Sequence, residues 1–457
     1  MTRALSLAKR FLFASLGSLP FLGAFISVLF MLWGSGRLEA RGVGALGDWV
    51  LACMMHPIGA VALIQALYTG LQSLLWMRYK PFVLAPLSSG GAGGEGAESG
   101  GVRVWPKVSV VIPAFNEGPM VERSIRSVAR CAYPKDKLEI IVVDDGSRDD
   151  TFFHMQRLRR EFPDLVKLVR FIQNAGKRAA LEAGFRAATG DIAVTIDSDS
   201  EMEAQTVHEM VTPFLVDPKI GAVAGRVAVL NRDSMISRML EVHYALKFDF
   251  GRAAESVYRC VACCPGALSA FRLSAILPYL TEWTGQSFLG RPVRHGEDQA
   301  LTNIVLRQGL DTVYQRTAVV HTLAPTTYHQ LSHMFTRWER SYIVEGFSFG
   351  GFMFKRYRQK NRVLPIVAFV VSNLRLVIFG WGILQLPLIF NEDLTTLWLS
   401  AIALMVGALF SAAYYLRIER SFRFIYGLLY SLFYICLLQW ILPYALITVR
   451  DERWGTR

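Results

Sequence analysis

Two long runs without a charged residue lie near the start of the chain, at residues 11–36 and 49–77. Each exceeds the roughly 20 residues that a helix needs to cross the hydrocarbon core of a bilayer. Lipid offers no hydrogen-bond partners to a backbone, so a run that enters it is restricted to a helix or a closed barrel. The sequence therefore predicts two transmembrane helices within residues 1–85.

Apolar character returns after residue 361, in runs at 363–390, 394–416 and 424–449. The whole chain is 52% hydrophobic and 19% charged, an apolar balance for 457 residues. We expect three further transmembrane helices within residues 362–457. Arg375 interrupts the first of these runs, and a charge at that depth is expected to line a polar path or to reach toward the interface.

Basic residues flank the N-terminal runs. Arg3, Lys9 and Arg10 precede the first run, as in a cleaved signal peptide, but the run is longer than the roughly 7–15 residues of a signal core. We therefore favour a membrane anchor. Arg78 and Lys80 follow the second run, and basic residues beside spans mark the cytoplasmic side. The middle of the chain is thus predicted to lie in the cytoplasm, beneath the plasma (inner) membrane.

The formal net charge of +12 suits anionic lipid or an anionic substrate. No basic run with interleaved aromatic residues occurs in the middle of the chain, so no nucleic-acid partner is expected. The six cysteines should remain thiols in the cytoplasm. The segment "CVACC" at 260–264 contains a C-x-x-C pair, but no second pair at zinc spacing accompanies it, which disfavours a zinc site.

A Gly/Ser-rich segment at residues 86–103, containing "PLSSGGAGGEGAESGG", predicts a flexible linker. After it, the runs "VSVVIP", "EIIVVDD", "VKLVRFI" and "DIAVTI" are typical of buried strands, and the segments between them have helical spacing. Strands that alternate with helices predict an open, mostly parallel α/β sheet, here in a domain of residues 104–330.

Polar side chains follow three of these strands at the edge where parallel sheets gather ligands. They are Asn116 and Glu117, Asp144 and Asp145, and Asp197 and Asp199. "DDGS" is also good turn and helix-cap chemistry, so that interpretation stays open for the second pair. Two carboxylates one residue apart, as in "DSDS", repel each other near a sheet core unless a cation lies between them. Their hard oxygens suit Mg²⁺ or Mn²⁺ carrying substrate phosphates.

No Gly-rich loop ending in Lys-Ser or Lys-Thr is present to hold such phosphates. The segment "NAGKR" instead places Lys177 and Arg178 at a predicted helix start, where cations and a helix N-terminus can meet an anion. We expect this basic pair to contact a diphosphate.

Seven short motifs resemble the family-2 glycosyltransferases, membrane synthases that extend polysaccharides from UDP-sugars. They fall between residues 108 and 341 and are "VVIPAFNE", "IIVVDDGSRDDT", "NAGKRAAL", "DSDS", "CCPGALSAFR", "GEDQALTN" and "MFTRWERS". Within the family they are most similar to hyaluronan synthases and nodulation chitooligosaccharide synthases. The resemblance implies a GT-A-like domain inserted between transmembrane α-helices, with interfacial amphipathic helices at residues 331–361.

The resemblance also implies roles on the donor side. Asp145, with Asp144, would contact the uracil end of UDP beside Phe115 and Glu117. Lys177 would face the nucleotide.

The metal and the diphosphate would lie next to these groups. Asp199 would be a ligand of Mg²⁺ or Mn²⁺, and Asp197 either a second ligand or an acid that contacts the sugar. Arg337 would reach the diphosphate as a bidentate donor.

On the acceptor side, Asp298 would be the general base that removes the proton of the acceptor hydroxyl, supported by Glu297. The alternative left open is that these acids cap the helix predicted at "QALTNIVLRQG". Trp338 would stack on the acceptor sugar, with Cys264 and Gly266 beside it.

The chain departs from the family pattern at two positions. Met334 stands where a Gln precedes Arg-Trp, and Gln330 or His333, on the helical face of Arg337, is expected to substitute for it. Gln299 stands where an Arg commonly follows the acids. The first departure bears on processivity and the second on donor choice.

The expected reaction is an inverting displacement that is processive and exports a β-linked polymer through the chain's own helices. One alternative is a non-processive transferase that adds a single sugar to a lipid carrier. Another is a transporter or receptor with an idle nucleotide-sugar domain, against which the intact acids argue.

Overall fold

The computed structural model describes residues 57–84, 104–355, 358, 361–374, 409 and 413–451. The chain divides into two compact units. The larger comprises Tyr79–Asn231, Glu255–Lys360 and Ile441–Arg457, and the smaller comprises Met1–Arg78, Arg232–Ala254 and Asn361–Trp440. The predicted span at 11–36, the linker at 86–103, Arg375 and most of the run at 394–416 lie outside the described residues.

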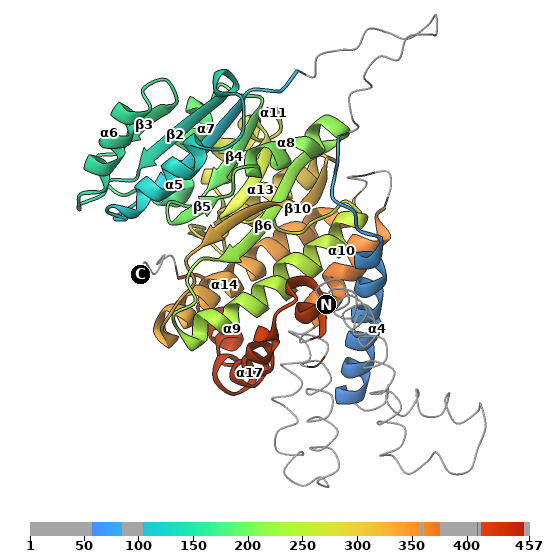
Figure 1. Cartoon of the computed structure of the whole chain (residues 1–457). Coiled ribbons are helices and arrows are strands. Elements are labelled where there is room, and N and C mark those ends of the chain that lie inside the picture. Colours follow the sequence, from blue (N-terminus) through green and yellow to red (C-terminus); the bar gives the residue numbers. More distant parts are fainter. Residues whose placement is uncertain are drawn as a thin grey trace, which may run out of the picture. The chain divides into compact units, whose positions relative to one another are not determined.

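The larger unit is built on an eight-stranded sheet (Figure 1). Its strands are β1 (Val108–Ala114), β2 (Leu138–Asp144), β3 (Val166–Arg170), β4 (Ile192–Ile196), β5 (Ser200–Met202), β6 (Ile220–Val229), β7 (Leu268–Arg272) and β10 (Asp311–Thr322). They lie in the order β3-β2-β1-β4-β7-β6-β10-β5. A separate hairpin pairs β8 (Ser287–Phe288) with β9 (Arg291–Pro292).

The half of the sheet that runs from β3 to β4 is parallel, and it confirms the four strands predicted from the sequence. Every residue of β1 and β2 is buried, as expected of parallel strands that are covered on both faces. The register that pairs Ala114 with Asp144 brings the carboxyl ends of β1 and β2 side by side. The loops that follow these strands therefore meet at one edge.

The other half makes the sheet mixed, but six of the eight strands run in one direction, so the expectation of a mostly parallel sheet is confirmed. Strand β7 is antiparallel to both β4 and β6, and β5 is antiparallel to β10, whereas β6 and β10 are parallel. The prediction rested on strand–helix alternation, and that pattern stops at β4. The connection from β4 to β5 is far shorter than the dozen or more residues of a parallel crossover.

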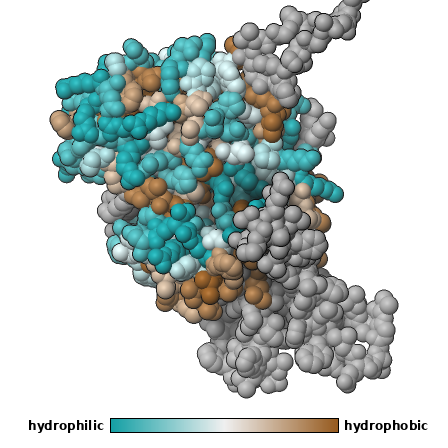
Figure 2. Space-filling model, viewed as in Figure 1, coloured by the Kyte–Doolittle hydropathy of each residue, from teal (hydrophilic) through white to brown (hydrophobic). Residues whose placement is uncertain are grey.

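Helices pack along this sheet. Helices α5 (Met120–Ala129) and α6 (Thr151–Glu161) lie against β1, β2 and β3, α7 (Lys177–Ala187) lies against β1 and β2, and α8 (Thr206–Val216) lies against β6 and β10. Gly184 lets α7 approach β1 closely, since a Cβ there would lie 2.3 Å from Val111 Cγ1. The surface over α5 and α6 is mostly hydrophilic (Figure 2).

The remaining helices of the larger unit follow later in the chain. They are α11 (Leu273–Ile276), α12 (Leu280–Thr284), α13 (Glu297–Arg307), α14 (Tyr328–Met353) and α18 (Ile441–Ile447), while α10 (Gly251–Val257) crosses into it from the smaller unit. Helix α14 packs against both α13 and α18. The segment "MFTRWERS" thus lies within α14, and the interfacial position expected for residues 331–361 stays a prediction.

The smaller unit contains α4 (Pro57–Arg78), α9 (Met235–Tyr244), a helix at Val363–Leu374 and α17 (Ile425–Phe433). Over the described ranges, no single helix is both long and apolar enough to cross a bilayer, although the bent pair Phe422–Phe433 and Cys436–Ile447 meets the criteria together. Exposed apolar side chains gather over α17 (Figure 2), at Ile425, Leu429 and Leu432. The five transmembrane helices stay predictions.

Candidate functional site

A buried carboxylate directly after β2 is hydrogen-bonded to the turn that precedes α7. Asp145 is 3% exposed and accepts hydrogen bonds from Ala175 N at 2.8 Å, Gly176 N at 2.9 Å and Asn174 Nδ2 at 2.8 Å. Burial raises the pKa of Asp145, the backbone hydrogen bonds oppose that rise, and the charge of Asp144 adds to it. These bonds fix the turn from which α7 begins. The contact of Asp145 with uracil stays a prediction.

Asp144 lies fully buried at the end of β2. Its Oδ1 accepts a hydrogen bond from Ser147 N at 2.9 Å, and Arg170 Nε of β3 lies 3.3 Å from its Oδ2. These contacts agree with the turn interpretation that the sequence left open for this residue. Asp144 therefore joins the ends of β2 and β3.

The loop after β1 is hydrogen-bonded to the loop after β2. Asn116 has a left-handed backbone (φ 53°), its N–H donates to Ser147 Oγ at 3.0 Å, and its Oδ1 accepts from Arg148 N at 2.9 Å. Phe115 and Glu117 flank Asn116 and are half-buried. The structure thus brings the predicted nucleotide-side residues of β1 and β2 to one edge of the sheet.

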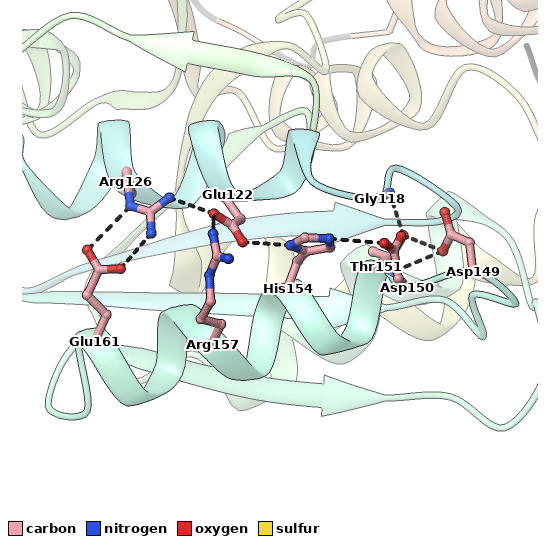
Figure 3. A network of polar contacts seen from close by, with 9 residues as sticks. All are labelled: Gly118, Glu122, Arg126, Asp149, Asp150, Thr151, His154, Arg157 and Glu161. Carbon is pink, nitrogen blue, oxygen red and sulfur yellow. Dashed lines mark hydrogen bonds and ion pairs between the residues drawn. The ribbon is translucent and has the colours of Figure 1, made fainter.

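The start of helix α6 is also hydrogen-bonded to the loop after β1. Thr151, its first residue, accepts hydrogen bonds from Glu117 N and Gly118 N, each at 2.8 Å. It also donates to Asp149 Oδ1 at 2.5 Å, and Figure 3 shows the contacts of Thr151 with Gly118 and Asp149. The β1 loop is therefore fixed by α6 as well as by the β2 turn.

A buried glutamate joins α5 to α6 next to that contact (Figure 3). Glu122 pairs with Arg126 at 2.6 Å, with His154 Nδ1 at 2.6 Å and with Arg157, and Arg126 also pairs with Glu161 at 2.6 Å. Burial opposes the ionisation of Glu122, but the hydrogen bonds from His154 and Arg126 outweigh it and lower its pKa. The hydrogen bond to Glu122 is the main reason that the pKa of His154 is raised.

The two acids of "DSDS" lie in the connection 197–199 between β4 and β5. The Ser124 hydroxyl of α5 lies 3.2 Å from Asp197 O and 2.5 Å from Ser200 O, which fixes the backbone of this connection. Asp199 Oδ1 accepts hydrogen bonds from Ser200 Oγ at 3.2 Å and Thr322 Oγ1 at 3.3 Å. The backbone of the acid pair is therefore fixed by α5, and Asp199 also contacts β10.

Lys177 bridges two of the predicted acids. Its Nζ lies 2.6 Å from Asp197 Oδ1 and 2.9 Å from Glu297 Oε1, and the three side chains are 20%, 29% and 7% exposed. Burial disfavours the charge of Lys177, but the two carboxylates outweigh it and hold its pKa above the ordinary value. A Cβ on Gly266 would lie 2.9 Å from Nζ, so Gly266 leaves room for the bridge.

Helix α13 begins at the second acidic pair. Gly296 is its N-cap (φ 70°), so Glu297 and Asp298 lie in the first turn and neither caps the helix through its side chain. Burial opposes the ionisation of Glu297, but Lys177 outweighs it and lowers the pKa of Glu297. Burial and the charge of Glu297 raise the pKa of Asp298, whose Oδ1 accepts from Gln299 N at 2.8 Å.

The segment before β7 contacts Asp298. Gly266 N donates to Asp298 Oδ2 at 3.0 Å, and Cys263 Sγ lies 3.7 Å from the same oxygen. The predicted Cys264 is fully buried, and its N–H donates to Thr302 Oγ1 at 3.0 Å. The thiol beside Asp298 thus belongs to Cys263, which the sequence interpretation missed because nothing in "CVACC" distinguishes the neighbouring cysteines.

Arg337 lies on α14, and its charge is one of those that lower the pKa of Glu297. Ser341, one turn further on, donates to Arg337 O at 2.8 Å. Trp338 packs edge-on against Phe335, with ring centroids 5.3 Å apart. The stacking of Trp338 on an acceptor sugar stays a prediction.

Gln330 was expected to replace the missing glutamine, and the structure corrects this. Its Oε1 accepts from Thr326 N at 3.2 Å, and with Thr327 it forms a capping box at the start of α14. The ring of His333 packs against His329, with centroids 4.3 Å apart. Gln330 caps the N-terminus of α14 because it lies in the first turn of that helix.

Arg178 was expected to contact a diphosphate with Lys177, and this is wrong. Its guanidinium is buried and donates to Trp283 O at 2.7 Å, Gln286 Oε1 at 2.7 Å and His295 O at 3.0 Å. Neighbouring residues of a helix point about 100° apart, so the side chains of this pair separate at the helix start.

A divalent cation fits the acid pair of "DSDS". Within the ranges that the structure describes, no group of three or more His, Cys, Asp or Glu side chains could hold a metal, and this includes "CVACC". Asp197 and Asp199 supply two carboxylates. That donor set suits Mg²⁺ or Mn²⁺, which takes one or two carboxylates and completes its shell with phosphate oxygens and water.

Residues 109–277 match the family model of glycosyl transferase family 2. An N-acetylglucosaminyltransferase of Azorhizobium caulinodans is 30% identical over 369 residues, which cover 79% of this chain and 90% of the relative. A hyaluronan synthase of Streptococcus pyogenes serotype M1 is 30% identical over 358 residues, 77% of this chain and 83% of the relative. The solved mannosyltransferase PcManGT of Pyrobaculum calidifontis, in complex with GDP-Man and Mn²⁺, is 22% identical with a TM-score of 0.50, covering 83% of this chain and 99% of that one, and shares the fold.

Proposed function

This chain belongs to glycosyltransferase family 2 and is a glycosyltransferase, and on that premise we propose that it transfers a sugar from a UDP-sugar to a growing β-linked polysaccharide. The transfer inverts the anomeric carbon and is processive. Relatives named N-acetylglucosaminyltransferase and hyaluronan synthase support this class of product. The first of those names makes UDP-N-acetylglucosamine the donor to test first.

The observation that carries the proposal is the bridge made by Lys177. It joins Asp197 of the β4–β5 connection to Glu297 of α13, at 2.6 Å and 2.9 Å. One cation thereby links the acid pair that suits a metal to the helix that carries Asp298. A donor sugar held at the first group would lie beside the second.

On the donor side, Asp197 and Asp199 would hold Mg²⁺ or Mn²⁺. The ion, when bound, neutralises charge on the diphosphate of the leaving UDP. The Mn²⁺ in the mannosyltransferase complex supports a divalent ion. Lys177 supplies a fixed positive charge at the same place, and preorganised charge of this kind often provides the largest catalytic contribution. Phe115 lines the uracil end of the site.

On the acceptor side, Asp298 removes the proton of the attacking hydroxyl. Its raised pKa suits a general base, because a stronger base accepts a proton more readily near neutral pH. Gly266 N and Gln299 N orient its two oxygens. Activity should fall as the pH is lowered through the raised pKa of Asp298, since protonation removes the base.

The membrane part of the proposal rests on the apolar runs and on the exposed apolar side chains of α17. The product would pass through a channel formed by the transmembrane helices. The runner-up is a non-processive transferase that adds one sugar to a lipid carrier. The two differ in product length.

The test uses the full chain in lipid vesicles with a panel of UDP-sugars and Mg²⁺ or Mn²⁺, and measures UDP release and product length. Long polymer enclosed by the vesicles supports the synthase, and a single lipid-linked sugar supports the runner-up. No UDP release from any donor would refute both. Asp298→Asn should abolish release while UDP still binds, and Asp164→Asn, an exposed acid between α6 and β3, is the matched control. Turnover retained in Asp298→Asn removes this residue from the role of base.

A further inference from the structure

A relay of polar side chains lies behind the acids of α13. Arg178 Nη1 donates to Gln286 Oε1 at 2.7 Å, Gln286 Nε2 donates to Glu345 Oε1 at 2.7 Å, and Asn303 Nδ2 donates to Glu345 Oε2 at 2.9 Å. Arg178, Glu345 and Asn303 are 5%, 1% and 4% exposed. These four residues are called the relay below. Its members come from α7, the segment between α12 and β8, α13 and α14.

The helices that the relay joins are the ones that carry the reaction. Helix α7 begins at Lys177, α13 begins at Glu297 and Asp298, and α14 carries Arg337. The three relay side chains that lie on helices, Arg178, Asn303 and Glu345, are each within a few turns of one of these groups. A shift of α7 against α13 would therefore break the relay and the bridge of Lys177 together.

Arg178 also clamps the backbone that leads into α13. Its Nη2 donates to His295 O at 3.0 Å, and its Nη1 donates to Trp283 O at 2.7 Å. The indole of Trp283 in turn donates to Glu297 O at 3.1 Å. The segment before Glu297 is thus held from both sides by one guanidinium and one indole.

The hydrogen-bond chemistry permits one arrangement of the relay. A guanidinium only donates, so the Gln286 oxygen must face Arg178 and its NH₂ must face Glu345. Each carboxylate oxygen of Glu345 then accepts from one amide. Either charge alone would be costly to bury, and the amide between them lets the two charges compensate each other.

We propose that the relay is a positioning device for sugar transfer, with Glu345 as the positioning residue that keeps Lys177 and the acids of α13 in register with α14. The inference rests on the proposed function. Glu345 touches none of the reacting groups in this scheme and acts through Gln286 and Asn303.

Three variants test this complementarity. In Glu345→Gln, the new NH₂ must face the NH₂ of Gln286 or of Asn303, so one donor loses its acceptor. In Gln286→Glu, two carboxylates meet. In the double variant, the carboxylate at 286 accepts from Arg178 and from the new amide at 345, whose oxygen accepts from Asn303. Every hydrogen bond of the relay is then restored with the negative charge moved by one position.

The kinetic readout is the kcat and donor KM of UDP release. We expect each single variant to lower kcat at least tenfold, about 1.4 kcal/mol of barrier, with donor KM changed less than threefold. The double variant should recover kcat to within threefold of wild type. Unchanged kcat in Glu345→Gln overturns the proposal. The proposal also fails if the fold-loss of kcat in the double variant equals the product of the fold-losses in the two single variants.

The second readout needs no turnover. Hydrogen exchange of the backbone amides at 293–300 should be faster in both single variants and normal in the double variant, while exchange at 138–144 in β2 stays constant. If wild-type protein releases no UDP, the proposed function fails, and the exchange pattern still decides whether the relay orders the start of α13. Unchanged exchange at 293–300 in Glu345→Gln refutes the relay independently.

Discussion

Replacing Lys177 with Met removes the ammonium group that bridges two carboxylates and keeps most of the side-chain volume. Asp197 and Glu297 would remain, 29% and 7% exposed, without the Nζ that now lies 2.6 Å and 2.9 Å from them. Removing one partner of a buried ion pair costs about 3–5 kcal/mol. We take the lower end, about 3 kcal/mol, because Asp197 is partly hydrated.

The lost interaction free energy should lower both the stability of the folded protein and the rate of catalysis. The folded protein can reduce its share by protonating Glu297, whose pKa Lys177 now lowers. The pKa of Glu297 in the variant would then be raised above its unfolded value, so the destabilisation should shrink as the pH falls. If the transition state relies on the full bridge, kcat falls by about two orders of magnitude. Lys177→Arg keeps the charge and should lose less.

The matched control is Lys167→Met. Lys167 pairs with the buried Glu139 at 2.6 Å but is 53% exposed and lies on β3, away from the acids of the site. We expect a smaller loss of stability there and an unchanged kcat. The assay combines UDP release with denaturant unfolding from pH 5 to 8. A Lys177→Met protein with kcat within threefold of wild type and unchanged unfolding would refute the role given to the bridge.

Three further changes have defined outcomes. Gly266→Ala places a Cβ 2.9 Å from Lys177 Nζ, so kcat should fall about tenfold with little change in unfolding temperature; equal losses in both would contradict this. Gly146→Ala would strain a backbone with φ of 74° and bring a Cβ 2.5 Å from a backbone carbon, so it should destabilise the protein by about 1–3 kcal/mol in denaturant unfolding, whereas Gly251→Ala, with open space around it, should not. The hydrogen bond to the buried glutamate of Figure 3 raises the pKa of His154 in the folded state, so its stabilisation is complete below the unfolded pKa and is lost as the pH rises through the folded one. His154→Gln should therefore destabilise the protein more at pH 5.5 than at pH 9, and an equal loss at both would rule out the charge.

The sequence was sufficient for the parallel half of the sheet and the acids at its edge. Strands β1, β2 and β4 form from mainly apolar runs, and the polar residues come directly after them, so local pattern determines their place. Asp145 and Asp197 could be located in this way without any long-range information. The start of α13 was also close to its predicted position, because Gly296 and the two acids after it mark a helix N-terminus.

The rest depends on contacts between distant segments. Lys177 and Glu297 are far apart in the chain, and no pattern in the sequence predicts that they will pair. Lys177 and Arg178 are adjacent and equally basic, yet one faces the acids and the other is buried, because the orientation of α7 is set by its packing on β1 and β2. Cys263 and Cys264 pose the same problem. The antiparallel β7 was not predicted, because it lies between β4 and β6 in the sheet but follows both of them in the sequence.

The carboxylate of Asp145 has a consequence for how this site evolves. It ties three hydrogen bonds into the turn that begins α7, while its strand-end position is the one expected to meet a nucleotide base. Natural selection for an ordered turn and selection for nucleotide recognition would retain the same aspartate. A lineage that lost its nucleotide substrate could therefore keep Asp145 unchanged. An aspartate at this position in a relative is thus weaker evidence for activity than an aspartate at the position of Asp298.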